Sequence, residues 1–212
     1  MNGYKFIKQL SRHLSPTAII IPDTGMNLAV TCQAIELKLG QELFTQFSQA
    51  PMGYSICAGI GAYYATHVDR KYELTDKAKE KFYNYKSDRE IVCIIGDGGF
   101  AMNSAEIETV VFNKIPLKIF IFDNNSYGIM EQTYKTWYNK SVATSPESGL
   151  GFPNIEKVCK AYGIKTVKLK KITDVKKIMK LKQFVCIVPI DKGSTISPKL
   201  KAGQRLGDIG EC

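Results

Sequence analysis

Two apolar runs constrain the fold of this chain most strongly, because each ends directly on polar residues of a kind that bind ligands. Residues 91–95 form the first run and are followed by Gly96-Asp97-Gly98. Residues 117–122 form the second and are followed by Asp123-Asn124-Asn125. A helical pattern separates the two runs, so both are expected as parallel strands that end at the same edge of a sheet. Open α/β sheets bind their ligands at this edge.

Strands and helices alternate through the rest of the sequence. The second half predicts strands over residues 91–95, 117–122, 164–169 and 184–190, and helices over 104–113, 154–162 and 173–181. The first half predicts a strand over 18–22 and helices over 27–39 and 55–66, preceded by a short helix within residues 1–10. This alternation predicts an α/β fold, with an open, mainly parallel sheet and helices on both faces.

The predicted domain organisation follows from this pattern. One domain covers residues 1–190, and residues 191–212 form an extended C-terminal tail. Residues 69–90 are charged and weakly periodic, which predicts a surface excursion with a short helix near 75–85. Residues 126–151 are polar with interspersed aromatic side chains, and they are predicted as a long loop at the ligand end of the sheet.

Bulk composition narrows the class of protein. A chain of 212 residues with 44% hydrophobic content can build one α/β domain with a full core. The sequence predicts neither a membrane span nor a signal peptide. None of the six cysteines forms a C-x-x-C pair, and Cys93 and Cys186 lie in predicted buried strands. We therefore expect reduced thiols that serve as small core residues, and a cytoplasmic location.

The net charge of +9 falls in residues 151–212, because acidic and basic residues balance before them. Such an excess raises the hypothesis of a basic domain that binds phosphate, nucleotides or nucleic acid. The lysines are spaced along an ordinary predicted helix and its flanking strands, and a solvated lysine face explains this spacing better. Nucleic acid and membranes are therefore not the expected partners.

Asp97 is flanked by glycines, which let main-chain N–H groups turn toward an anion. A helix is expected to start near Ser104, with Asn103 as its cap and Glu106 completing a capping box, and its dipole would favour the same anion. Taken singly, Asp97 and Asn124 are equally explained as turn residues. Their spacing of 27 positions, at equivalent ends of adjacent predicted strands, favours a site for a metal ion and a diphosphate.

The segment GDGGFAMNSAEIETVVFNKIPLKIFIFDNN resembles the diphosphate-binding motif of the thiamine diphosphate enzymes of the acetolactate synthase and pyruvate decarboxylase superfamily. The resemblance covers roughly residues 15–190 and is to their C-terminal, diphosphate-binding domain. By spacing, Asp123 takes the place of the first asparagine of the family motif and Asn124 that of the second, so Asn125 is a neighbour. The resemblance implies a Mg²⁺ ion held by Asp97, Asn124 and the main-chain carbonyl of Ser126.

Two further segments resemble this family. Gln49-Ala50-Pro51-Met52-Gly53-Tyr54 is similar to the segment that holds the pyrimidine ring of the cofactor, where Met52 would support the bent cofactor; a plain core role for Met52 is the alternative. Residues 23–27 lie where the family has a diphosphate loop after its first strand. The resemblance thus implies cofactor contacts from Thr24, Gly25, Met26, Asn27, Ala50, Met52, Gly96, Gly98, Gly99, Tyr127 and Gly128.

One catalytic group of the family has no counterpart in this sequence. The glutamate that activates the pyrimidine ring lies, in these enzymes, on a separate N-terminal domain that usually comes from a neighbouring subunit. The resemblance therefore implies a component that acts on 2-oxo acids by decarboxylation or carboligation and is inactive alone. Its partner would be a pyrimidine-binding domain or subunit, in a homo- or hetero-oligomer. A non-catalytic module that binds the cofactor and assembles with another chain is the alternative.

The substrate signal is weaker than the cofactor signal. Acetolactate synthases carry a tryptophan shortly after the asparagine pair, where it shapes the pocket for the second substrate. This chain has Thr133 at the matching position, and Trp137 comes four residues later. The resemblance therefore favours a 2-oxo acid substrate without favouring acetolactate as the product.

Overall fold

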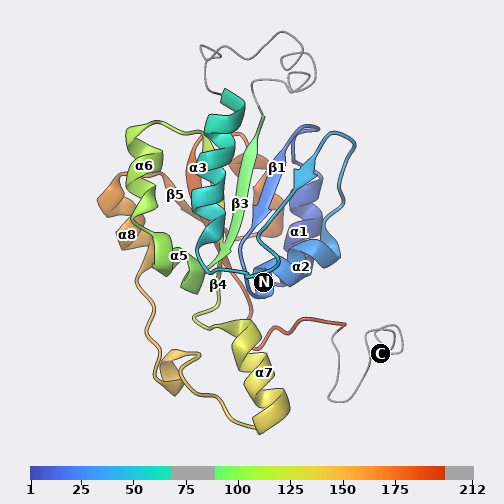
Figure 1. Ribbon diagram of the computed structural model, residues 1–212, viewed down its shortest axis with the longest axis vertical. Helices are drawn as coiled ribbons and strands as arrows, with labels where there is room; N and C mark the ends of the chain where they lie inside the picture. The colour runs from blue at the N-terminus through green and yellow to red at the C-terminus, as the bar shows by residue number, and fades with distance from the viewer. Residues whose placement is uncertain (68–88, 199–212) are drawn as a thin grey trace.

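The computed structural model describes residues 1–67 and 89–198, which build a six-stranded sheet between two layers of helices (Figure 1). The strands are β1 (Ile19–Pro22), β2 (Glu42–Leu43), β3 (Ile91–Gly96), β4 (Leu117–Asp123), β5 (Thr166–Lys168) and β6 (Phe184–Pro189). They lie in the order β2-β1-β3-β4-β6-β5, and every neighbouring pair is parallel. The predicted α/β class and the parallel sheet are confirmed.

Helices cover both faces of the sheet (Figure 1). On one face lie α1 (Gly3–Ser11), α2 (Met26–Ala34) and α9 (Val175–Ile178). On the other lie α3 (Tyr54–His67), α5 (Asp97–Asn103), α6 (Glu106–Phe112) and α8 (Ile155–Tyr162). The remaining helix, α7 (Gly128–Tyr138), projects beyond the edge at which β3 and β4 end. Two 3₁₀ turns, η1 (Pro146–Ser148) and η2 (Ile172–Asp174), complete the described elements.

Side chains along β4 alternate between the two helical layers. Phe120 and Phe122 point to the layer of α1, where the ring of Phe6 lies 5.5 Å and 5.6 Å from theirs. Ile119 and Ile121 point to the layer of α3 and α8. The strand is therefore buried on both faces, and this is why its sequence is an almost unbroken apolar run.

One charge lies within this apolar run. Lys118 is buried, and its ammonium group donates to Glu90 Oε1 at 2.6 Å and to the main-chain oxygen of Met179 at 2.6 Å. Both contacts satisfy a charge that would otherwise be costly inside the protein. The ion pair of Lys118 and Glu90 lies at the beginning of β4. The polar segment that follows β4 lies at the opposite end of the strand.

The strand order places a crevice at one edge of the sheet. From β1 the chain moves outward to β2, whereas from β3 it moves the other way to β4. Neighbouring strands whose connections diverge in this way leave a crevice beyond their carboxyl ends, and ligands bind there in open α/β folds. Asp23 follows β1, Asp97 follows β3 and Asn124 follows β4 at this same edge.

Several predicted elements need correction. The helix predicted over residues 27–39 ends at Ala34, because Ile35 is already extended, and the short strand β2 follows. The helix predicted over 173–181 is a 3₁₀ turn followed by the short α9. The loop predicted over 126–151 contains α7 and η1. The helix predicted near 75–85 and the last part of the predicted tail lie outside the described residues.

The predicted cap of the helix after β3 is also wrong. Helix α5 begins at Asp97 itself and not near Ser104, and α6 follows with Ala105 as an N-cap that makes no side-chain hydrogen bond. The amide of Asn103 donates instead to the main-chain oxygen of Gly53 at 3.1 Å. Asn103 thus joins the end of α5 to the turn before α3, which follows the predicted site residues Ala50 and Met52.

The cysteines of the described residues are free thiols. Cys93, Cys159 and Cys186 are buried as expected, but Cys32 and Cys57 are exposed and do not serve as core residues. No helix in the described part of the chain is long and apolar enough to span a membrane.

Candidate functional site

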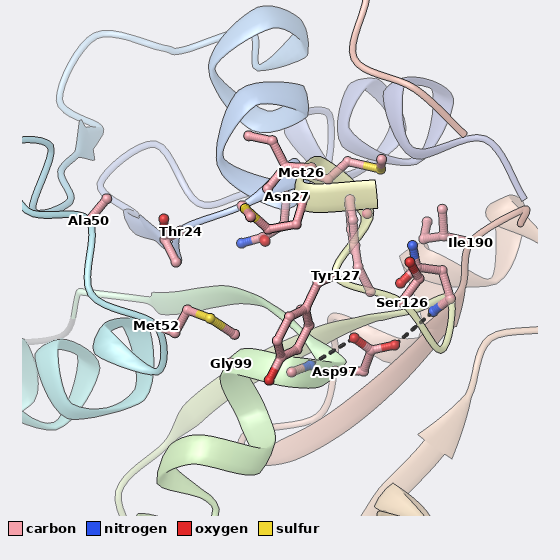
Figure 2. Close-up of a pocket in the computed structure, with 18 residues that line it drawn as sticks. Thr24, Met26, Asn27, Ala50, Met52, Asp97, Gly99, Ser126, Tyr127 and Ile190 are labelled. Atoms are coloured by element: carbon pink, nitrogen blue, oxygen red, sulfur yellow. Dashed lines mark hydrogen bonds between the residues drawn. The ribbon is translucent and has the colours of Figure 1, made fainter. Parts of the chain in front are cut away.

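The carboxylate of Asp97 joins the ends of β3 and β4 (Figure 2). Its Oδ1 accepts a hydrogen bond from the N–H of Gly98 at 2.7 Å, and its Oδ2 accepts from the N–H groups of Asn124 at 3.1 Å and Asn125 at 2.7 Å. Asp97 is only 2% exposed. Burial raises the pKa of its carboxyl to about 6, although the three hydrogen bonds act in the opposite direction. The two predicted strand-end motifs therefore meet at one carboxylate.

Three oxygen atoms converge here, one of them from this carboxylate. The side-chain oxygen of Asn124 faces Asp97 Oδ2 at 3.3 Å and the main-chain oxygen of Ser126 at 3.0 Å, with no donor between them. Asn125, in the left-handed region at φ 52°, makes the tight turn that brings the Ser126 carbonyl back. Only a donor or a cation can satisfy such a cluster. Turning the amide by 180° would supply donors, because its NH₂ group would then reach both oxygens.

A cavity of about 220 Å³ opens at this oxygen cluster. It is lined by every residue that the sequence predicted as a cofactor or metal contact. Figure 2 places Ala50 and Met52 at one end of the cavity and Ser126 at the other, with Tyr127 and Asp97 between them. The residues predicted to contact the ring therefore lie at one end and Ser126, predicted to bind the metal, at the other; the roles themselves stay predictions.

Four apolar side chains of the lining were not predicted: Phe122, Ile129, Met130 and Ile190. Phe122 and Ile190 are the last residues of predicted strands, so their position at the ligand edge could have been read from the sequence. Ile129 and Met130 lie on α7, which was predicted as loop, and the sequence carried no signal that would place them here.

Three helices begin at the cavity without a side-chain cap. These are α2 after Gly25, α5 after Gly96 and α7 after Tyr127. The first N–H groups of a helix have no partner within it and carry a partial positive charge, so an uncapped N-terminus favours an anion. Three such ends at one cavity make it suited to a ligand with several negative charges, such as a diphosphate.

Gly98 leaves room for the two large side chains that meet over it. A Cβ atom at Gly98 would lie 2.2 Å from Tyr127 Cε1 and 3.1 Å from Met52 Cε. The ring of Tyr127 also packs edge-on against Phe152, with 5.7 Å between the centroids. The glycine at this position therefore determines how closely Tyr127 and Met52 approach the floor of the cavity.

Asp23 holds the turn that carries Met52, although the sequence did not single it out as a site residue. Its Oδ2 accepts from the N–H of Gly53 at 3.0 Å and its Oδ1 from the N–H of Ser55 at 3.1 Å. Asp23 is fully buried, and this burial raises the pKa of its carboxyl. A buried acid directly after an apolar strand was the available signal. Its partners, about 30 residues further on, could not be read from the sequence.

Two predicted cofactor contacts also have a structural role. The amide of Asn27 donates to the main-chain oxygens of Asp23 at 2.8 Å and Ile94 at 2.9 Å, and so connects β1 with β3 where these strands separate. Gly99 packs against Asp23, because a Cβ atom there would lie 2.2 Å from Asp23 Oδ2. Both residues therefore help to fix the shape of the cavity they line.

Comparison with known proteins gives the family. The family model described as the C-terminal TPP binding domain of thiamine pyrophosphate enzymes matches residues 23–187. The chain is 27% identical over 207 residues to the acetolactate synthase large subunit of Lactococcus lactis, which covers 96% of this chain and 32% of that protein. It is 26% identical over 216 residues to the probable acetolactate synthase large subunit of Methanococcus aeolicus, covering 97% of this chain and 32% of that protein.

A third relative agrees with these two. The acetolactate synthase isozyme 1 large subunit of Escherichia coli K12 is 26% identical over 176 residues, which is 82% of this chain and 27% of that protein. The chain spans about a third of the length of the curated relatives it matches. The strand-end motifs and the uncapped helix ends all lie within the residues that the family model matches. This chain belongs to the thiamine pyrophosphate enzymes and corresponds to their C-terminal TPP-binding domain.

Proposed function

We propose that this chain is the thiamine diphosphate- and Mg²⁺-binding component of an enzyme that decarboxylates or ligates 2-oxo acids. The observation that carries the proposal is the cavity where Asp97, Asn124 and Ser126 meet the N-terminal ends of three helices. Mg²⁺ is bound by few protein oxygens and keeps water and phosphate oxygens as its other ligands. This donor set fits Mg²⁺, and a cation at this point would hold the amide of Asn124 with its oxygen inward.

The diphosphate would lie at the uncapped ends of α2, α5 and α7, beside the metal. Gly25 and Gly96 place no side chain at these ends, whereas the N–H of Gly98 already donates to Asp97 Oδ1. Asn27 holds the first turn of α2 against the sheet. Asp97 orients the metal and, through its three N–H partners, fixes the loop that supplies the other two oxygens. Each of these groups acts on the charged end of the cofactor.

The ring end of the cofactor would lie at Met52 and Ala50. Thiamine diphosphate, when bound, supplies the carbanion chemistry of the reaction. The role of the protein here is to bind and orient: Asp23 fixes the Met52 turn through two main-chain N–H groups, so that turn is in place before a ligand arrives. Tyr127 and Met52 exclude water from the floor of the cavity.

Three observations support a site that a second domain completes. The cavity measures about 220 Å³, below the range of roughly 300–1,000 Å³ typical of complete ligand sites. No glutamate lines it among the residues that the structure describes. Ile129 and Met130 at its border keep about 40% of their surface exposed. We propose that a glutamate-bearing pyrimidine-binding domain, from another chain or another part of a longer one, covers this border in a cytoplasmic oligomer.

Calorimetric titration of the chain with thiamine diphosphate in excess Mg²⁺ tests the proposal, with the Asp97→Ala variant as control. We expect saturable binding that depends on Mg²⁺ and is lost in the variant. Binding that is equal in both proteins, or absent even when a glutamate-bearing pyrimidine domain is supplied, would refute it.

A second experiment separates the enzyme component from a non-catalytic assembly module. The absence of a lining glutamate is compatible with both. Consumption of pyruvate and other 2-oxo acids is measured after the pyrimidine domain is added. Turnover supports the enzyme component, and binding and assembly without turnover support the module. The proposal does not extend to acetolactate as the product, because Thr133 stands where those synthases carry tryptophan.

A further inference from the structure

The loop that carries the oxygen cluster borders two cavities. Asn124 and Ser126 line the cofactor cavity, and both also line a second cavity of about 480 Å³. The second cavity is lined by polar residues and glycine, without an apolar side chain. Across this cavity, therefore, the described residues offer the loop no apolar side chain, and hydrogen bonds hold it on this side.

One such hydrogen bond comes from α7. The hydroxyl of Ser126 donates to Glu131 Oε2 at 2.5 Å, and Lys135, one turn further along α7, pairs with Glu131 Oε1 at 2.5 Å. Two different groups of Ser126 thus make contacts on two sides of the loop. Its carbonyl oxygen faces Asn124 in the oxygen cluster, while its hydroxyl is held by Glu131 on the side of the polar cavity.

Helix α7 itself is attached by polar contacts, because none of its side chains is buried. The amide of Gln132 exchanges two hydrogen bonds with the main chain of Ile196, at 3.1 Å and 3.0 Å. Main-chain N–H of Tyr127 donates to the oxygen of Thr144 at 2.8 Å. These contacts fix the helix to the protein, and Glu131 connects the fixed helix to the loop.

We propose that Glu131, held in place by Lys135, is a positioning residue for the metal site. By fixing the hydroxyl of Ser126, it fixes the direction of the Ser126 carbonyl and so completes the oxygen cluster. This inference rests on the proposed function, because it assumes that the cluster binds Mg²⁺. It adds a residue on α7 that makes no contact with the metal or the cofactor.

The test measures the affinity of the full chain for Mg²⁺ by calorimetry, at a fixed excess of thiamine diphosphate. Loss of a group that orients a metal ligand typically weakens metal binding by about 10–100-fold. We expect Glu131→Ala to raise the dissociation constant of Mg²⁺ by about tenfold. Ser126→Ala keeps the main-chain carbonyl and removes only the hydroxyl, so it should give the same loss. The double variant should be no worse than either single one, because both remove the same contact.

A rescue and a matched control complete the test. Glu131→Gln keeps an acceptor for the Ser126 hydroxyl and should recover most of the affinity. Glu147→Ala removes another carboxylate of the same polar cavity, one that pairs with Lys192 at 3.1 Å. It should leave the affinity unchanged. The thermal midpoint of each variant without ligands should stay at the value of the unmodified chain.

The outcomes distinguish the two claims. If Glu131→Ala binds Mg²⁺ as tightly as the unmodified chain while Asp97→Ala does not bind, the positioning role is refuted and the proposed function stands. Equal weakening by Glu131→Ala and Glu147→Ala would assign the effect to lost negative charge in general, and this too would overturn the positioning role. If the unmodified chain binds neither Mg²⁺ nor thiamine diphosphate even when a glutamate-bearing pyrimidine domain is supplied, both claims fall.

Discussion

Replacing Asp23 by Asn tests whether a buried carboxylate holds the Met52 turn. The carboxylate accepts from two main-chain N–H groups, those of Gly53 and Ser55, one at each oxygen. An amide of the same shape has a single acceptor, so one buried N–H would face an NH₂ group. Leaving a buried donor unpaired costs about 1–3 kcal/mol, and the remaining bond loses the additional strength of a charged acceptor, about 1 kcal/mol.

The substitution also removes a buried negative charge, and this stabilises the folded chain, because burial raises the pKa of Asp23. We expect a net loss of about 2 kcal/mol of unfolding free energy at pH 7. With a urea dependence of about 2 kcal/mol per molar, the midpoint of urea unfolding would fall by about 1 M. Thiamine diphosphate should also bind more weakly to the variant, since the turn that carries Met52 loses its support.

Asp123→Asn is the matched control. Asp123 is half-buried and burial raises its pKa as well, but its carboxylate accepts no main-chain N–H within the described ranges. Removing its charge should leave the urea midpoint unchanged or raise it slightly. If Asp23→Asn unfolds at the same urea concentration as the unmodified chain, the two hydrogen bonds do not hold the turn, and the reasoning fails.

Three further predictions concern protonation, space and a buried ion pair. Since the pKa of Asp97 rises from 3.8 to about 6 on folding, the folded chain without Mg²⁺ holds an extra proton in this interval. Its unfolding free energy should fall by up to about 3 kcal/mol as the pH rises from 4 to 6, while its affinity for Mg²⁺ rises. Urea unfolding measures the first change and calorimetry the second. A profile that stays flat across this pH range would contradict the expectation. Gly98→Ala should displace the ring of Tyr127 and weaken thiamine diphosphate binding by at least about tenfold, a loss worth about 1.4 kcal/mol. The thermal midpoint should change little, because the side chain of Tyr127 can move aside. A stable variant that binds thiamine diphosphate normally in calorimetry would refute this. Glu90→Ala leaves the ammonium of Lys118 buried without its carboxylate and should lower the unfolding free energy, measured with urea, by about 3 kcal/mol. Adding Lys118→Met should recover most of this loss. A double variant as unstable as the single one would contradict the explanation.

Much of the site could be predicted because strand ends in a parallel sheet converge. Residues 96–98 and 123–125 follow apolar runs, so their meeting at one edge follows once the runs are recognised as neighbouring parallel strands. The contact between Asp97 and the N–H groups of Asn124 and Asn125 bears this out. The assignment of a ring end to Met52 rests only on the resemblance of its segment to a known family and stays a prediction.

The remaining parts could not be placed from the local pattern. Helix α7 was predicted as loop because its segment is polar with interspersed aromatic residues, although Met130, Tyr134 and Tyr138 recur at helical spacing in it. Helix α5 starts with Asp97 and two glycines, and glycine is a poor helix former, so the start was expected further on. The role of Asp23 depends on a turn about 30 residues away, and a contact of this kind is not encoded by local pattern.

The contact between Gly99 and Asp23 limits how this domain can vary in sequence. With 2.2 Å between a Cβ atom at position 99 and Asp23 Oδ2, a side chain at one position excludes the acid at the other. The acid holds Gly53 through a main-chain N–H that any residue except proline supplies, so positions 23 and 99 form the unit of substitution. In a library randomised at positions 23 and 99, we expect functional clones to change both residues jointly. Single changes should be lost even where each new residue is harmless elsewhere in a sheet protein. Paired substitutions, and not the residue type at any single position, would then show in the sequences how the Met52 turn is held.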